Sequence, residues 1–256
     1  MKKKARGLNL QGSEGTENQN EAVRLQLFMA HCGVASRRAC EKLIKEGQVS
    51  VNGKVVCEMG VKVLPTDEVL VSGQKITLEQ NLRYVLLNKP AGYVCSSKDE
   101  KGRKTAASLL YPFYHERLYN VGRLDMFSSG LLIFTNDGQF AAKLSHPSSQ
   151  IEKEYIVDTS TPLPRCLAGD FMKGVRIAGV FYRCEKAVEL NSHRLCVVLA
   201  EGKNREIRRV FEYYETGIKN LMRVRIGCVG VGTLQIGQHR DLTKAEVKAL
   251  LKSCEN

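Results

Sequence analysis

The pattern of apolar and polar residues first separates a short N-terminal unit, expected at residues 22–76. Its apolar spacing predicts two short helices, one that opens at Leu25 and one that Ser36 caps and that ends at Gly47. Alternating residues on both sides of Asn52-Gly53 then predict a β-hairpin, since this pair readily adopts the positive φ angles of a two-residue turn. We therefore expect a small unit of helices and a hairpin ahead of the main domain.

A second unit is expected over residues 83–252, where short strands are mixed with helices. The strands are predicted at residues 83–87, 130–135, 155–159, 175–177, 181–190, 194–200 and 221–226. The helices are predicted at residues 138–145, 163–172, 204–216 and 243–252, the last with a capping box of Thr243 and Glu246. Because many strands follow one another without a helix between them, the pattern favours a mixed, mainly antiparallel sheet flanked by helices, and so an α+β fold.

Residues 1–21 combine lysines with polar residues and lack any apolar period, which predicts a disordered basic tail. The polar run after the first lysines lacks the apolar core of a signal peptide. No apolar run approaches the roughly 18 residues that span a bilayer. Nine scattered cysteines, an odd number without Cys-x-x-Cys spacing, are typical of reduced thiols. We expect a cytoplasmic protein that does not contact membranes.

The charge balance of the chain indicates the kind of partner that it binds. The chain has 39 Lys and Arg against 27 Asp and Glu, a net charge of +12 that favours an anionic partner such as nucleic acid. No phosphate-binding glycine loop, dinucleotide fingerprint or histidine spacing typical of metal sites occurs in the sequence. The sequence therefore predicts neither a metal site nor a soluble cofactor.

The most informative candidate chemistry lies between residues 120 and 134. Asp125 follows Arg123 closely, in a run of small and polar residues that leads into an apolar strand. This layout is typical of a carboxylate kept ionised at the edge of a sheet, where it can act as a nucleophile. An ordinary salt bridge in a loop explains the same spacing.

Basic residues gather in the second predicted helix, at the start of the helix expected from residue 204, and in the strand at residues 221–226. Alternation would place both arginines of that strand on one face. Each group fits a phosphate-binding surface or a solvated face, and the basic start of the helix from residue 204 also suits a catalytic carboxylate. The residues concerned are Arg37, Arg38, Lys42 and Lys45, then Lys203, Arg205, Arg208 and Arg209, then Arg223 and Arg225.

Two further segments have ordinary structural interpretations. Tyr155 follows Lys153-Glu154 at the start of a strand, where a tyrosine is more often a core or rim residue than a reactive one. Residues 88–92, Asn-Lys-Pro-Ala-Gly, are expected to form a tight turn after a strand.

Taken together, these motifs resemble the RsuA-type ribosomal RNA pseudouridine synthases over residues 83 to about 250. Residues 24–70 resemble the small RNA-binding domain named after ribosomal protein S4, which often precedes that catalytic domain. The motifs that carry the resemblance are Gly122-Arg123-Leu124-Asp125, Ser129-Gly130-Leu131-Leu132, Lys153-Glu154-Tyr155, the run from Glu201 to Arg209, and Arg223-Val224-Arg225-Ile226-Gly227.

The resemblance implies an isomerase that converts a uridine of ribosomal RNA to pseudouridine without a cofactor. It implies that Asp125 is the catalytic aspartate, that Arg208 pairs with it, and that Tyr155 lies against the uracil. Arg123 would be the neighbour of the aspartate in the motif and would help to fill the space that a flipped nucleotide leaves. The aspartate could start the reaction in three ways, which the sequence does not distinguish: by attack on C1′, by attack on the uracil ring, or by removal of the C2′ proton.

The implied partner is ribosomal RNA or an assembly intermediate of a ribosomal subunit, bound by a monomer. Two other classes of protein share the basic charge. A non-catalytic RNA-binding protein of ribosome assembly would not need the set of Asp125, Tyr155 and Arg208. A metal-dependent RNA nuclease would need a cluster of carboxylates, which the sequence does not display. The target uridine, and the subunit that contains it, stay open.

Overall fold

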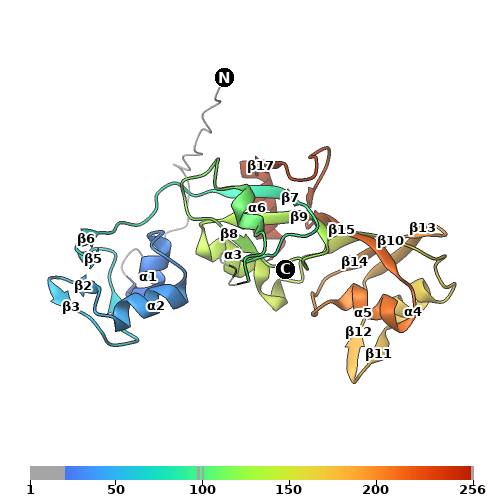
Figure 1. Cartoon of the computed structure of the whole chain (residues 1–256), viewed down its shortest axis with the longest axis horizontal. Coiled ribbons are helices and arrows are strands. Elements are labelled where there is room, and N and C mark those ends of the chain that lie inside the picture. The colour runs from blue at the N-terminus through green and yellow to red at the C-terminus, as the bar shows by residue number, and fades with distance from the viewer. Residues whose placement is uncertain (1–20, 97–98, 100, 255–256) are drawn as a thin grey trace. The chain divides into compact units, whose positions relative to one another are not determined.

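The computed structural model describes residues 21–96, 99 and 101–254 of the chain, in two compact units (Figure 1). The first unit extends to Arg83 and also takes in Tyr114–Arg117 and Asn136–Gly138. The second unit holds Tyr84–Phe113, Leu118–Thr135 and the chain from Gln139 onward. The tail expected at residues 1–21 lies outside the described residues, except for Glu21.

The first unit packs two helices against short strands, and its local signals are confirmed. The Ser36 hydroxyl accepts the N–H of Ala39 at 3.2 Å and so caps the second helix, while Asn52 and Gly53 take φ angles of 48° and 78° in the hairpin turn. Leu25, Phe28 and Ile44 are among the buried residues that form its core. Its elements are β1 Val23–Arg24, α1 Leu25–His31, α2 Arg37–Lys45, β2 Val49–Val51, β3 Lys54–Val55, β4 Lys62–Val63, β5 Val69–Val71 and β6 Gln74–Lys75.

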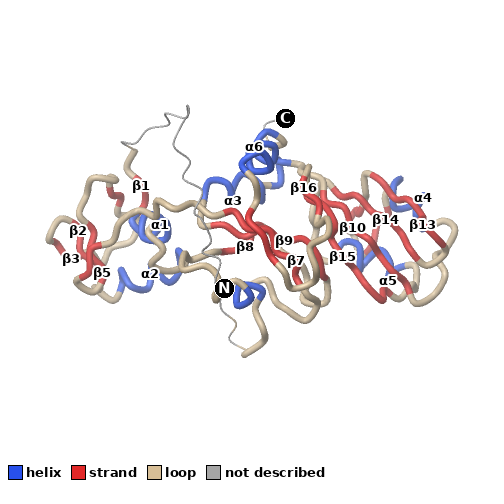
Figure 2. The backbone as a smooth tube through the Cα atoms, turned by 90° about the horizontal axis from the view of Figure 1, so that it is seen from above, coloured by secondary structure: helices blue, strands red, loops and turns tan. Residues whose placement is uncertain are grey.

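The second unit is built on a nine-stranded sheet. Figure 2 shows β9, β15, β10, β14 and β13 following one another across it. The strands run in the order β13-β14-β10-β15-β9-β7-β17, with β16 added to β15 and β8 added to β9. Among the described strands of this sheet β9 and β15 pair in parallel and the other pairs are antiparallel, so the expected mixed, mainly antiparallel α+β fold is confirmed. The strands are β7 Tyr84–Lys89, β8 Tyr119–Val121, β9 Ser129–Thr135, β10 Lys153–Thr159, β13 Lys186–Asn191, β14 Arg194–Leu199, β15 Ile218–Ile226, β16 Val229–Gly230 and β17 His239–Asp241.

Helices cover this sheet where its residues are apolar. Phe171 of α4 and Phe211 of α5 belong to one buried cluster with Val157, Val197 and Leu221 of the sheet, so these two helices pack on one face of β10, β14 and β15. The remaining elements are η1 Ala106–Leu109, α3 Gly138–Ser145, η2 Pro147–Ser149, α4 Leu167–Lys173, the hairpin of β11 Val175–Ile177 and β12 Val180–Tyr182, α5 Glu206–Tyr213 and α6 Lys244–Lys252.

Three predicted elements differ from the structure. The strand expected at residues 181–190 is two strands, because β12 closes a hairpin with β11 whereas β13 joins the main sheet beside β14. The helix expected from residue 163 begins only at Leu167, since the N–H of Leu163 bonds to the carbonyl of Ser192 instead of opening a helical turn. The helix expected from residue 204 begins at Glu206, because Arg205 takes a left-handed conformation with φ 52°.

Strand β9 changes partners along its length, and this change creates the opening for a site. Its C-terminal half, at residues 133–135, pairs with β8, whereas Ser129 and Gly130 pair with β15. The loop that joins β8 to β9 therefore leaves the sheet where one neighbour ends and the other begins. Gly130 makes this junction possible, because a Cβ atom there would lie 2.2 Å from the carbonyl oxygen of Arg223.

We predict that Gly130→Ala lowers the free energy of unfolding of the second unit by about 2–4 kcal/mol, since an overpacked contact adds to a φ of +103° that L-residues avoid. Urea-induced unfolding measures this. Gly169→Ala is the matched control, because its Cβ would meet nothing within 4 Å and it lies within helix α4, so stability should stay or rise. A Gly130 variant as stable as the wild type would show that the two strands have room to separate.

Candidate active site

The loop from Gly122 to Ser128 carries Asp125 at the junction of β8 and β9, and α5 holds it in place. Arg208, in the first turn of α5, places its Nε 3.5 Å from an Asp125 carboxylate oxygen. The same guanidinium donates from Nη2 to the Phe127 carbonyl at 3.0 Å and to the Ser128 hydroxyl at 3.1 Å. Burial lowers the pKa of Arg208, and the negative charge of Asp125 opposes that effect. Arg208 therefore binds both the carboxylate and the backbone that carries it.

Lys89 holds the same loop from the other side. This residue ends β7 and is 0% exposed, and its ammonium group donates to the carbonyls of Pro90 at 2.8 Å, Tyr93 at 2.9 Å and Met126 at 3.4 Å. The Met126 carbonyl also accepts the N–H of Gly92 at 2.7 Å. A turn was predicted at residues 88–92, but β7 extends to Lys89 and the turn falls at residues 91–92. The buried cation was not predicted, because a lysine after an apolar strand ordinarily points to solvent.

A third contact fixes the loop just before the aspartate. The N–H of Leu124 donates to the Cys95 sulfur at 3.3 Å, and Leu124 itself is buried. The N–H of Ser128 donates to the carbonyl of Asp125 at 3.0 Å and closes a turn over Met126 and Phe127. The backbone on both sides of Asp125 is thus tied to neighbouring elements.

A cavity of about 110 Å³ opens beside the Asp125 carboxylate. The four residues singled out for catalysis, Arg123, Asp125, Tyr155 and Arg208, all line it, although they come from three separate stretches of the chain. Its apolar lining residues include Leu199 from β14, Ile207 from α5 and Leu221 from β15. The cavity thus combines the carboxyl groups of Asp125 and Glu206 with basic side chains, an aromatic ring and apolar walls, which suits a flat heterocycle.

A larger cavity of about 490 Å³ adjoins the first and shares Arg123, Tyr155 and Lys203 with it. Lys153 and Arg223 also line this second cavity. Burial is the main cause that lowers the pKa of Lys153, and the charge of Arg223 adds to it. The acidic residue in its lining, Glu201, is paired with Lys203 at 2.5 Å. The surroundings of Tyr155 are therefore strongly basic.

The expected basic face of the strand at residues 221–226 is wrong. Tyr155 pairs with Arg223 but its neighbour Glu154 pairs with Arg225, so a bulge at Val224 turns the two arginines to opposite faces of the sheet. Arg223 is 3% exposed and donates to the Leu131 carbonyl at 2.8 Å. It lines the larger cavity instead of an open RNA-facing surface.

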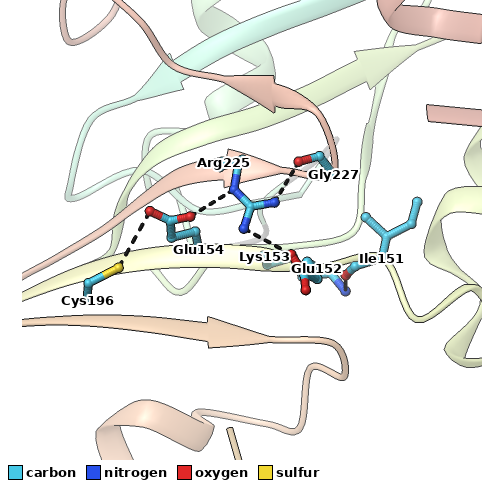
Figure 3. A network of polar contacts seen from close by, with 7 residues as sticks. All are labelled: Ile151, Glu152, Lys153, Glu154, Cys196, Arg225 and Gly227. Carbon is cyan, nitrogen blue, oxygen red and sulfur yellow. Dashed lines mark hydrogen bonds and ion pairs between the residues drawn. The ribbon is translucent and has the colours of Figure 1, made fainter. Parts of the chain in front are cut away.

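Arg225 is occupied within the protein, as Figure 3 shows. Its guanidinium donates to Glu154 at 2.8 Å, to Glu152 at 3.0 Å and to the Gly227 carbonyl at 2.7 Å. Two glutamates thus neutralise this arginine, and it presents no excess positive charge to a phosphate.

The other predicted RNA-binding residues fall into two groups. Near the site, Arg205 is exposed, and Arg209 is exposed but donates to the Tyr182 hydroxyl at 3.0 Å and the Asn204 side chain at 3.3 Å. In the first unit the structure leaves the cations of α2 at least partly exposed, with Lys42 near Glu46 at 3.6 Å. These four are Arg37, Arg38, Lys42 and Lys45.

Within residues 21–96, 99 and 101–254, no three His, Cys, Asp or Glu side chains come together in a way that would hold a metal ion. None of the helices in that part of the chain is long and apolar enough to cross a bilayer.

We predict a pH dependence of stability that arises from Lys89. Burial lowers the pKa of its ammonium group from the ordinary 10.5 to about 8. Between these values the unfolded chain binds the proton more tightly than the folded chain, so folded stability rises as the pH increases. The gain is absent below about pH 8, is complete above about pH 10.5, and amounts to about 3 kcal/mol.

The test compares urea unfolding of the wild type and of Lys89→Met from pH 7 to pH 11. Other groups titrate in both proteins and cancel, so the wild type should gain about 3 kcal/mol relative to the variant over this range. A difference that does not change with pH would contradict the burial of a charged Lys89.

Two protein families match the chain, each over its own stretch. The family described as RNA pseudouridylate synthase matches residues 83–213, and the S4 domain matches residues 23–78. The ribosomal large subunit pseudouridine synthase B of Bacillus subtilis is 40% identical over 233 residues, 89% of this chain and 95% of that protein. An uncharacterized RNA pseudouridine synthase of Borreliella burgdorferi is 37% identical over 239 residues, 92% of this chain and 96% of that protein.

A crystal structure of a pseudouridylate synthase has a TM-score of 0.65 and 27% identity, and the match covers 89% of this chain and 99% of that one. Both family matches, the shared length of the relatives and this structural likeness point the same way. The chain belongs to the RNA pseudouridine synthase family, with an S4 domain ahead of the catalytic domain.

Proposed function

We propose that this protein isomerises one uridine of large-subunit ribosomal RNA to pseudouridine, with Asp125 as the catalytic carboxylate. The observation that carries the proposal is the ion pair of Asp125 and Arg208 in a cavity that Tyr155 also lines. The choice of the large subunit rests on the Bacillus subtilis relative, whose name specifies that subunit.

The reaction needs a carboxylate and a way to hold the base. The bond between N1 and C1′ breaks, the uracil turns while bound, and a bond between C5 and C1′ forms as the C5 proton is lost and N1 regains a proton. Asp125 is suited to attack carbon or to accept a proton, because the Arg208 guanidinium beside it holds its carboxylate at the cavity. The product is an isomer of the substrate, so no energy source or redox partner enters the balance.

The base has to leave its stack before the carboxylate can reach it. Target atoms within a stacked RNA strand are inaccessible, and enzymes that act on such atoms extrude the nucleotide into a pocket. Tyr155 is partly buried in the wall of the cavity, where its ring would lie against the flipped uracil between apolar side chains such as Leu221. Arg123 is exposed and lines the same cavity. It could fill the space that the flipped nucleotide leaves in the RNA stack, or bind a phosphate.

Helix α2 of the S4 domain would contribute affinity. Arg38, Lys42 and Lys45 follow i, i+4, i+7 spacing and so share one face, opposite the buried Cys40 and Ile44. Exposed cations on one helix face suit the phosphates of a folded RNA. The partner is ribosomal RNA, free or in an assembly intermediate.

Asp125→Asn tests the role of the carboxylate. We expect pseudouridine formation to fall by at least about 10³-fold, because the amide keeps the shape of the side chain but neither attacks carbon nor accepts a proton. The measurement is pseudouridine mapping of total ribosomal RNA from cells that lack the protein, complemented with the wild type or the variant.

Asp158→Asn is the matched control. This carboxylate also pairs with an arginine, Arg194, at 2.6 Å, but it lies outside the Asp125 cavity. It should restore the modification like the wild type. A folded Asp125→Asn protein that still forms the pseudouridine would refute the assignment, and cleaved RNA in place of modified RNA would favour a nuclease. An unchanged map in cells without the protein would favour a non-catalytic role in assembly.

Replacing Arg37, Arg38, Lys42 and Lys45 by Gln tests the role of α2. We expect weaker binding to the ribosomal RNA hairpin that contains the mapped uridine. The slope of log K against log salt concentration should be smaller in magnitude by up to about three, since each lost phosphate contact reduces the number of released counterions. Turnover at saturating enzyme should persist. Lys54→Gln with Lys75→Gln, exposed in the same unit, is the control, and an unchanged slope in the α2 variant would contradict the proposal.

A further inference from the structure

Phe127 is the most exposed large apolar side chain among the described residues, at 67%. It lies two positions after Asp125, on the turn that leads from the carboxylate into β9. Single exposed apolar side chains are common on protein surfaces and need no explanation by themselves. The position and the support of this one set it apart.

The backbone beneath Phe127 is fixed on both sides. Its own carbonyl accepts a hydrogen bond from Arg208 at 3.0 Å, and the preceding carbonyl, of Met126, accepts from Gly92 at 2.7 Å. The following residue, Ser128, is buried, and its hydroxyl bonds to Arg208 at 3.1 Å. A rigid turn thus holds an aromatic ring out in solvent, instead of letting it fold back onto the core.

The Phe127 ring lies close enough to Asp125 to contact the nucleotide next to the reacting one. Two Cα steps of about 3.8 Å place the Phe127 Cα no more than about 7.6 Å from that of Asp125. A carboxylate at the sugar of a flipped nucleotide therefore puts the ring near the adjacent nucleotide, whose base loses a stacking neighbour when the uridine leaves. Aromatic side chains stack on exposed bases of any sequence, and the arginines at positions 123 and 205, both exposed, favour the phosphates there.

We infer that Phe127 stacks on the nucleobase directly flanking the flipped uridine and so stabilises the extruded state. The inference rests on the proposed function, since it needs an RNA with its uridine in the Asp125 cavity. Phe127 is then a positioning residue, because it acts on the neighbouring base and leaves the reacting atoms to Asp125.

The test uses the full-length protein and an RNA hairpin that carries the uridine identified by mapping. Phe127→Ala and Phe127→Leu should each raise KM about tenfold with little change in kcat, the scale of one lost base–aromatic stack. Phe127→Trp and Phe127→Tyr should stay within about threefold of the wild type, because they keep a ring. Phe181→Ala removes another exposed phenylalanine of the second unit and should leave both constants unchanged.

A second readout reports stacking directly. Hairpins with 2-aminopurine 5′ or 3′ of the target are bound to the Asp125→Asn protein and to the double variant that also carries Phe127→Leu. Stacking quenches this base, so one of the two hairpins should fluoresce several-fold more brightly with the double variant. Unchanged fluorescence of both hairpins, or a Phe127→Leu protein with the KM of the wild type, would overturn the inference. If the wild-type protein converts the uridine of the hairpin, the proposed function stands even when the Phe127 variants overturn the stacking inference.

Discussion

Two cations, the buried Lys89 and the partly buried Arg208, hold successive carbonyls of the loop that carries Asp125, and the site depends on these contacts. Lys89 donates to the carbonyl of Met126, and Arg208 donates to that of Phe127. Burying a cation is costly unless its donors are satisfied. Backbone oxygens accept from the Lys89 ammonium group and from Nη2 of Arg208, whereas Nε of Arg208 faces the Asp125 carboxylate at 3.5 Å without a hydrogen bond. The contacts that offset the cost of burying these cations are therefore the same contacts that make the loop rigid. A carboxylate held in place in this way needs little rearrangement during the reaction.

The sheet positions these contacts through one row of residues that pair across neighbouring strands. Lys89 pairs with Gly130, Gly130 with Arg223, and Arg223 with Tyr155, so the four positions lie side by side across β7, β9, β15 and β10. Gly130 has no side chain, and the backbones of β9 and β15 approach closely there. The bulge at Val224 then keeps Arg223 on the face of Tyr155 while Arg225 turns away to the glutamates.

Local signals in the sequence were good guides to local structure. The Ser36 cap, the Asn52-Gly53 turn and the capping box of Thr243 and Glu246 were all predicted, because each depends on residues within a few positions of one another. The motifs that contain Asp125, Tyr155 and Arg208 were likewise legible in the sequence, and the structure gathers them around one cavity. Their roles as catalytic groups stay predictions.

The features that were missed depend on distant parts of the chain. A strict alternation put Arg223 and Arg225 on one face, and only the pairing with β10 reveals the bulge. Lys89 gave no sign of burial, since the loop at residues 122–128 that covers it is remote in sequence. The exposure of Phe127 follows from backbone contacts with Arg208 and Gly92, which no periodicity encodes.

Amide hydrogen exchange in the RNA-free protein tests whether the Asp125 loop is rigid before substrate binds. We expect slow exchange for the N–H groups of Leu124 and Ser128, which are bonded to the Cys95 sulfur and to the Asp125 carbonyl. Arg208→Met should speed exchange at Ser128 by about tenfold or more, whereas Arg209→Met, one residue along α5, should leave it unchanged. Fast exchange in the wild type, or equal exchange in the two variants, would show that these contacts do not hold the loop rigid.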